Sequence, residues 1–348
     1  MQSPPSWRAG KPRAFFYCLE VRLAFPYQKS VRLGKMCERI FVLLFFGLIM
    51  TARADFQEFQ KIPFDGTLAA ALQRTAEATL RDFPKLTPEN LALSVIDLTN
   101  PAAPMRADYH GDTSFYPASV MKLFIMVETF RQGKHTPEIE RALREMIRVS
   151  DNDATAYLLD VLTGTTAGPE LAGEALAEFI ERRRALNRTF EKLGYDISVM
   201  MKPWSFGPYG REMQLVGEKR ENRNRACANA LAALLDSIVR RRAVSAEASE
   251  AMLALIERPL DPPRPEENQV RDFLGESLPP GTKLWSKSGE TSEVRHDAAY
   301  VELPGGRKLV IVILTRAGEV KEFLPAIGKQ LIADLPDRRG KSATPDSD

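Results

Sequence analysis

The sequence has 348 residues but only three cysteines, three histidines and three tryptophans. So few cysteines exclude a disulfide framework, which holds small secreted domains together. The histidines are scattered, at positions 110, 135 and 296, and neither a Cys-x-x-Cys nor a His-Glu-x-x-His motif occurs. We therefore expect no metal site and no cofactor.

A strong charge of one sign is also lacking. Lysine and arginine number 48 against 46 aspartates and glutamates, which gives a net charge of +2. There is no long basic block of the kind that nucleic-acid binders carry, so nucleic acid is not an expected partner. With 44% apolar and 27% charged residues, the composition is ordinary for a globular protein and excludes collagen, coiled coil and bulk disorder.

No apolar run near the N-terminus is long enough to span a membrane. Ile40–Met50 has eleven residues, whereas a transmembrane helix needs roughly 20. The small-x-small pattern Ala52-Arg53-Ala54 follows it, which is typical of a signal peptide cleaved before Asp55. A start at Met36 makes residues 36–54 the signal and residues 1–35 a misassigned extension. The alternative is a short membrane anchor, which the length of the run disfavours.

Removal of this leader changes the balance of the chain. Residues 1–54 hold nine basic and two acidic residues, so residues 55–348 carry 39 and 44 and a net charge of −5. Cys227 alone remains, so no internal disulfide can form. We expect a periplasmic or secreted monomer without stable membrane insertion, and a disordered tail at residues 338–348.

Strand patterns lie near both ends of residues 55–337 and helical patterns lie between them. The expected strands are Leu91–Asp97, Met105–Tyr109, Lys283–Lys287, Ala298–Leu303 and Lys308–Leu314. The expected helices are Leu68–Arg81, Ser119–Gln132, one beginning at Pro137, Ala154–Leu162, Leu171–Leu193, Ala226–Arg242, Ser245–Glu257 and Val320–Leu335. Residues 195–224 and 259–281 are expected to be irregular. This order predicts an α+β fold, with an α/β lobe from residues 55–118 and 275–337 and an inserted all-helical lobe at 119–274.

Three short motifs occur in a fixed order. They are Ser119-Val120-Met121-Lys122, Ser150-Asp151-Asn152 and Lys287-Ser288-Gly289. Each is weak evidence by itself, but all three in order and in fitting contexts are expected by chance in fewer than ~1% of chains.

The first motif can supply a nucleophile and its base. Ser119 begins a helix, where the backbone N–H groups favour developing negative charge, and Lys122 lies one turn later. Lysine can take the serine proton only if its pKa falls from about 10.4 towards 7. Apolar neighbours and a second cation, Lys287, would both lower it. A helix cap and an exposed lysine are the alternative, which the other two motifs disfavour.

The ordered trio resembles the signature of the class A β-lactamase and penicillin-binding serine hydrolase family. The resemblance covers most of Leu91–Leu335. It implies a mostly antiparallel sheet flanked by helices, a helical lobe, and a site in the cleft between them.

The resemblance also implies a role for each motif residue. Ser119 is the acylated nucleophile, and Lys122 takes or relays its proton. Ser150 passes a proton to the leaving nitrogen, whereas Asn152 holds the substrate side chain and contacts the lysine. Asp151 caps and braces the loop.

Further residues are implied to bind the substrate. Lys287, Ser288 and Gly289 lie on an edge strand that binds the substrate carboxylate, aided by Arg295. The alternative role of Arg295 is a surface ion pair. The N–H groups of Ser119 and Glu290 form the oxyanion hole. The acidic side chain of Glu290 either repels anionic β-lactams or points outward.

Two features depart from the family pattern. The family's deacylating base lies in Glu-x-x-Leu-Asn, whereas here Glu212-Met213-Gln214-Leu215 is followed by Val216, with Glu218 and Glu221 as other candidates for the base. Ser119 and Ser150 are 31 residues apart, about half the separation in the best-known β-lactamases, which predicts a more open cleft.

The resulting hypothesis is a serine β-lactamase that takes a small-molecule β-lactam. The alternatives are a D,D-peptidase or other acyl hydrolase that takes an acyl-peptide, and a penicillin-binding sensor that is acylated without turnover.

Overall fold

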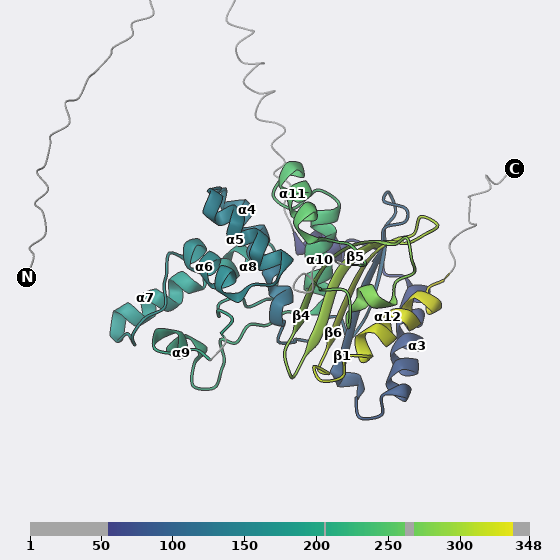
Figure 1. Ribbon diagram of the computed structural model, residues 1–348, viewed down its shortest axis with the longest axis horizontal. Coiled ribbons are helices and arrows are strands. Elements are labelled where there is room, and N and C mark those ends of the chain that lie inside the picture. The colour runs from purple at the N-terminus through teal and green to yellow at the C-terminus, as the bar shows by residue number, and fades with distance from the viewer. Residues whose placement is uncertain (1–54, 205–206, 262–267, 337–348) are drawn as a thin grey trace, which may run out of the picture. The chain divides into compact units, whose positions relative to one another are not determined.

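Six antiparallel strands form one sheet in the order β2-β1-β6-β5-β4-β3 in the computed structural model (Figure 1). The strands are β1 Leu91–Asp97, β2 Met105–Tyr109, β3 Glu257–Arg258, β4 Lys283–Glu290, β5 Arg295–Glu302 and β6 Lys308–Thr315. Because β1 pairs with β6, segments more than 200 residues apart in the sequence build the same sheet. The predicted α+β class with a mostly antiparallel sheet is confirmed.

The structure describes residues 55–204, 207–261 and 268–336. The predicted extension at 1–35, the signal peptide at 36–54 and the tail at 338–348 lie outside these ranges. Within them, no helix is long and apolar enough to cross a membrane. The same ranges contain no group of three or more His, Cys, Asp or Glu side chains placed to hold a metal ion.

Both faces of the sheet are buried, which explains the long apolar runs in its central strands. On β6, Leu309, Ile311 and Ile313 pack in one core, whereas Val310 and Val312 pack in the other. Successive strand residues point to opposite faces, so the central strands β1, β5 and β6 contribute to both cores.

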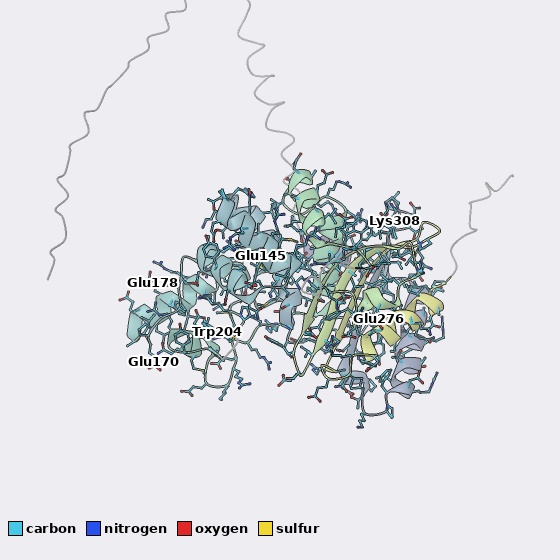
Figure 2. All side chains as sticks on the ribbon, viewed as in Figure 1. Glu145, Glu170, Glu178, Trp204, Glu276 and Lys308 are labelled. Carbon is cyan, nitrogen blue, oxygen red and sulfur yellow. The ribbon has the colours of Figure 1, made fainter. Side chains whose placement is uncertain are left out.

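Different helices cover the two faces. The helices are α2 Phe56–Gln60, α3 Gly66–Asp82, η1 Pro88–Asn90, η2 Ala118–Met121, α4 Lys122–Gln132, α5 Pro137–Arg148, α6 Asn152–Thr163, α7 Gly173–Arg183, α8 Ala185–Glu191, α9 Arg211–Val216, α10 Ala228–Val239, α11 Ala246–Ile256, η4 Leu274–Ser277 and α12 Phe323–Asp334. The pair α3 and α12 pack together over one face, and α10 contacts β1, β5 and β6 on the other. Helices α4 to α9 lie to one side of the sheet (Figure 1). Figure 2 labels Glu145, Glu170 and Glu178 in this helical part, Glu276 beside the sheet and Lys308 at the start of β6.

Three expectations about residues 119–274 were wrong in detail. This lobe was predicted to be all-helical, but it contains strand β3 of the sheet, because Glu257 and Arg258 pair with β4. The predicted helix Leu171–Leu193 is two helices, because Arg184 has ψ of 0° and the chain turns there. The segment expected to be irregular contains the short helix α9. It begins after Gly210, whose φ of 52° favours glycine, and this local start was not recognised in the sequence.

Candidate active site

Ser119 lies in the short 3-10 turn η2, directly before α4. Its side chain is partly exposed, whereas those of the next two residues, Val120 and Met121, are buried. The preceding residue, Ala118, has φ of 44°, in the left-handed region that residues other than glycine rarely adopt. Backbone strain of this kind persists only where the surroundings hold it, and it is concentrated at functional sites.

Strand β4 passes close to Ser119 at Gly289. A Cβ atom at Gly289 would lie 2.7 Å from the Ser119 nitrogen and 2.8 Å from the Val120 nitrogen. Both contacts are with backbone atoms, which cannot swing aside. Glycine is therefore required at this position for the two segments to lie side by side.

Lys122 is fully buried beneath the turn and donates hydrogen bonds to the Ser150 loop. Its Nζ lies 2.6 Å from the Ser150 carbonyl oxygen, 3.1 Å from Ser150 Oγ and 2.9 Å from Asn152 Oδ1. Burial lowers the pKa of Lys122 to about 7, and nearby Asp151 opposes the change. Within the described residues, no hydrogen bond joins Lys122 Nζ to Ser119 Oγ.

The Ser150 loop is also strained and capped. Ser150 has φ of 60°, and Asp151 accepts a hydrogen bond of 2.6 Å from the Ala154 nitrogen at the start of α6. Asp151 therefore caps the helix as the sequence predicted. The cap holds Asn152 where its side-chain oxygen reaches Lys122.

Lys287 approaches Ser150 from the sheet. Its Nζ lies 3.0 Å from Ser150 Oγ, 2.6 Å from Gln269 Oε1 and 2.8 Å from the Ser288 carbonyl oxygen. Burial, Lys122 and Arg258 hold the pKa of Lys287 well below its ordinary range. The hydroxyl of Ser150 thus joins two buried lysines, and we refer to these three side chains as the Lys122–Ser150–Lys287 chain.

Gln269 is a site residue that the sequence reasoning missed. It is 3% exposed, and its Oε1 also accepts hydrogen bonds from the Ser288 nitrogen and Ser288 Oγ, at 3.1 and 3.0 Å. It lies outside the three motifs, in the proline-rich segment that was expected to be irregular, so no pattern in the sequence indicated a role for it. Its oxygen is bound to the donors that were expected to hold a substrate carboxylate.

Arg295 and Glu290 are cross-strand partners on β5 and β4. The Arg295 guanidinium lies 2.5 Å from Glu290 Oε2 and packs 4.9 Å from the centre of the Phe273 ring. Arg295 therefore forms an ion pair, but its own side chain is buried and not at the surface as the alternative role assumed. It also neutralises the acidic side chain that follows Gly289.

The model of the Beta-lactamase enzyme family matches residues 132–337. The chain belongs to this family. The match includes Ser150, Asn152 and Lys287 and begins after Ser119 and Lys122. No curated protein matches the chain.

Solved structures share the fold at low sequence identity. PBP-A is 20% identical with a TM-score of 0.55, over 78% of this chain and 98% of that one. The beta-lactamase from Sphaerobacter thermophilus DSM 20745 is 18% identical with a TM-score of 0.53, over 78% and 99%. A class A beta-lactamase from Mycobacterium abscessus is 14% identical with a TM-score of 0.55, over 76% and 98%.

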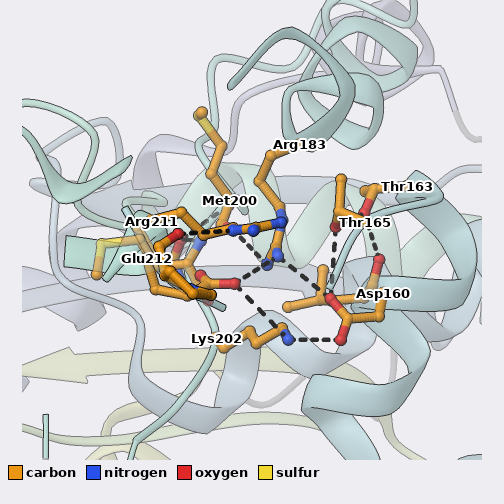
Figure 3. A network of polar contacts seen from close by, with 12 residues as sticks. Asp160, Thr163, Thr165, Arg183, Met200, Lys202, Arg211 and Glu212 are labelled. Atoms are coloured by element: carbon orange, nitrogen blue, oxygen red, sulfur yellow. Dashed lines mark hydrogen bonds and ion pairs between the residues drawn. The ribbon is translucent and has the colours of Figure 1, made fainter. Parts of the chain in front are cut away.

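The structure does not bring Glu212 to the lysines of this β-lactamase-family site. Glu212 is 1% exposed and lies 2.7 Å from Arg183 Nη2 and 3.7 Å from Lys202 Nζ (Figure 3). Asp160 completes the group, at 3.2 Å from Arg183 and 2.5 Å from Lys202. We call these four residues the buried charge cluster. Its two cations and two anions balance, so the Glu212 carboxylate is held by partners outside the Lys122–Ser150–Lys287 chain.

The other candidates for the deacylating base are on the surface. Glu218 and Glu221 are both exposed, and Glu221 accepts a hydrogen bond from the nearby Lys219 nitrogen. Within the described residues, Lys122 makes no ion pair or hydrogen bond with a carboxylate.

Proposed function

We propose that this protein is a serine hydrolase of the β-lactamase family that opens the β-lactam ring through an acyl-enzyme at Ser119. The observation that carries the proposal is the Lys122–Ser150–Lys287 chain beside a partly exposed serine. A lysine with a pKa of about 7 is half neutral at neutral pH and can accept the proton of an attacking hydroxyl.

In the acylation step, Lys122 and Ser150 relay a proton from Ser119 to the leaving nitrogen. Ser119 Oγ attacks the lactam carbonyl carbon while its proton passes to Lys122 Nζ. The tetrahedral intermediate collapses, the carbon–nitrogen bond breaks, and the nitrogen takes a proton from Ser150 Oγ. Ser150 then recovers a proton from Lys122, which leaves the ring open and an ester on Ser119. The cation of Lys287 favours the transient negative charge on Ser150.

We assign the remaining roles to residues around this chain. The N–H groups of Ser119 and Glu290 stabilise the oxyanion, a role supported by the close approach of Gly289 to the Ser119 nitrogen. Asn152, Ser288 and Arg295 bind the substrate. Water then hydrolyses the ester and restores the Ser119 hydroxyl.

A second candidate function follows from the position of Glu212. Its carboxylate is bound to Arg183 and Lys202, so the described residues supply no carboxylate next to Lys122 to activate the deacylating water. Slow deacylation would make the protein a penicillin-binding enzyme of the D,D-peptidase type or a sensor. One solved structure of similar fold is an acyl-enzyme complex of a PBP-A mutant with penicillin G.

Turnover and intact mass with a chromogenic cephalosporin separate the two candidates. Sustained turnover that is lost in Ser119→Ala supports a β-lactamase. A stoichiometric adduct on Ser119 without turnover supports the second candidate, which should then cleave an acyl-D-Ala-D-Ala peptide. If the protein shows no turnover and forms no adduct, a β-lactam is not its substrate.

We also propose that the protein is exported as a monomer, cleaved before Asp55. The supporting pattern is the apolar run Ile40–Met50 followed by Ala52-Arg53-Ala54. Expression of the full chain in a bacterial host should yield periplasmic protein whose intact mass corresponds to a chain that starts at Asp55. A membrane-bound product with an uncleaved N-terminus would favour the anchor instead.

A further inference from the structure

Two buried side chains bind the end of α5 just before the Ser150 loop. The Ile147 carbonyl accepts hydrogen bonds from Arg258 Nη2 at 2.5 Å and Gln269 Nε2 at 3.0 Å. The Arg148 carbonyl accepts from Arg258 Nη1 at 3.0 Å and Gln269 Nε2 at 2.9 Å. The last carbonyl groups of a helix have no partner within it, so these donors satisfy groups that would otherwise be buried unpaired.

The same two side chains bind strand β4 with their remaining polar atoms. Arg258 Nε donates to the Ser286 carbonyl at 3.3 Å, and Gln269 Oε1 accepts from Lys287 Nζ, the Ser288 nitrogen and Ser288 Oγ. Arg258 is 4% exposed and Gln269 is 3% exposed, so water does not compete for these bonds. We call this pair the Arg258–Gln269 clamp, because it connects α5 to β4.

We propose that the Arg258–Gln269 clamp positions the Lys122–Ser150–Lys287 chain. The clamp holds the end of α5, two residues before Ser150, against β4 and so fixes the distance between Ser150 and Lys287. The inference rests on the proposed acylation of Ser119. Neither residue is hydrogen-bonded to Ser119 or Ser150, so both act through the segments that they hold.

The polarity of the Gln269 amide is determined by its partners. Its oxygen faces three N–H or O–H donors, and its nitrogen faces two carbonyl oxygens. The three hydrogens of the Lys287 ammonium group are all used, on Gln269, Ser150 and the Ser288 carbonyl. Gln269 therefore orients Lys287 toward the Ser150 hydroxyl.

An amide at this position also keeps extra negative charge away from the two lysines. The charged groups around Lys287 are Lys122 on α4, Arg258 on β3, Asp297 on β5 and Glu290 on β4. Lys122 and Arg258 lower the Lys287 pKa, and the two acids raise it. A carboxylate in place of the Gln269 amide would raise the pKa of Lys287 and of Lys122.

The test compares Gln269→Leu, Gln269→Glu and Arg258→Lys in the full protein, with fluorescent penicillin as the acylating probe. Gln269→Leu should slow acylation of Ser119 by about 10- to 100-fold, because a small displacement of a reacting group has effects of this size. Arg258→Lys keeps the positive charge but cannot donate to the three carbonyl groups that the planar guanidinium reaches. It should slow acylation by a smaller factor than Gln269→Leu. Gln269→Glu restores the contact with Lys287 and should move the rise of the acylation rate to higher pH.

Matched controls and a probe-independent measurement complete the design. Gln330→Leu and Arg307→Lys alter half-buried side chains outside the site and should leave acylation unchanged. Titration of Lys122 and Lys287 by lysine ¹⁵N NMR should give altered pKa values in the clamp variants only. If the wild type is not acylated, the proposed function fails. The titration needs no substrate, so it still tests whether the clamp positions the two lysines.

Wild-type acylation and unaltered lysine titrations in folded Gln269→Leu and Arg258→Lys would overturn the inference. The inference would also be overturned if the clamp variants melt at a lower temperature but are acylated at the wild-type rate per folded molecule. The clamp would then contribute to stability alone.

Discussion

At the residue scale, Lys122 is the group whose chemistry depends most on burial. A cation without water loses its hydration, and the pKa of Lys122 falls from 10.5 to about 7. We expect the acylation rate to rise about tenfold from pH 6 to pH 8, because only the neutral amine accepts the Ser119 proton. Stopped-flow acylation with penicillin across this range measures the profile.

The corresponding variants are Lys122→Arg and Lys134→Arg. Arginine stays protonated, so Lys122→Arg should acylate at least ~100-fold more slowly at every pH. Lys134 is exposed and donates to the Val161 carbonyl, and its replacement should change nothing. A wild-type rate that does not vary between pH 6 and pH 8 would exclude Lys122 as the base.

Gly289 gives a second prediction at this scale. Gly289→Ala places a methyl group 2.7 Å from the Ser119 nitrogen, so η2 and β4 must separate. A displacement of about 1 Å at a reacting group can reduce a rate by ~100-fold, and we expect acylation to fall by that order. Gly66→Ala is the control, since no atom lies within 4 Å of its added Cβ. Equal acylation by the two variants would show that the close approach is unimportant.

The motif residues could be predicted from the sequence, whereas their supporting residues could not. Ser119, Lys122, Ser150 and Lys287 stand in recognisable order, and three of them form one hydrogen-bonded chain. Gln269 has no neighbouring pattern, because its partners lie 18 to 122 residues away in the sequence.

At the element scale, helix caps determine where the Ser150 loop ends. Asp151 caps α6 through the Ala154 nitrogen, and Ser245 caps α11 through the Ala248 nitrogen. Both replacements by alanine should lower the free energy of unfolding by about 1 kcal/mol. Only Asp151→Ala should also slow acylation, by about tenfold, because it loosens Ser150.

Urea unfolding and acylation kinetics on the same samples distinguish the two effects. Asp151→Asn should restore both properties, because asparagine is an equally good cap. If Asp151→Ala acylates like the wild type, the cap contributes stability alone and the loop is held by other contacts.

Element boundaries were predictable where a local signal marks them. Pro137 is a local start signal, and α5 begins there as predicted. Helix α3 begins at Gly66, two residues before its predicted start at Leu68, because Asp65 caps it. The division between α7 and α8 was missed, because nothing in the apolar spacing distinguishes Arg184 from its neighbours. Strand β4 extends to Glu290, beyond its predicted end at Lys287, because β5 supplies partners as far as Arg295.

At the scale of the whole molecule, the buried charge cluster joins three helices and a loop. Glu212→Gln removes one of two anions and leaves Arg183 and Lys202 with a buried excess charge. We expect the free energy of unfolding to fall by about 3–5 kcal/mol, with acylation of the folded protein retained. Thermal unfolding together with intact-mass acylation tests both parts.

Glu218→Gln is the matched control, because this glutamate is exposed and its loss should change neither property. A Glu212→Gln protein with wild-type stability and a trapped acyl-enzyme would instead make Glu212 the deacylating base.

The sequence by itself determined the features that depend on neighbouring residues. Alternation predicted the strands, helical spacing and caps predicted most helices, and the ordered motifs predicted the reacting groups. Only the tertiary structure decided which distant groups meet: β1 with β6, Gly289 with Ser119, Gln269 with Lys287, and Glu212 with Arg183. Such pairs form when elements pack, and packing depends on the whole set of contacts and not on any local pattern. For the same reason the neutral form of Lys122 is a property of its burial, which no single motif specifies.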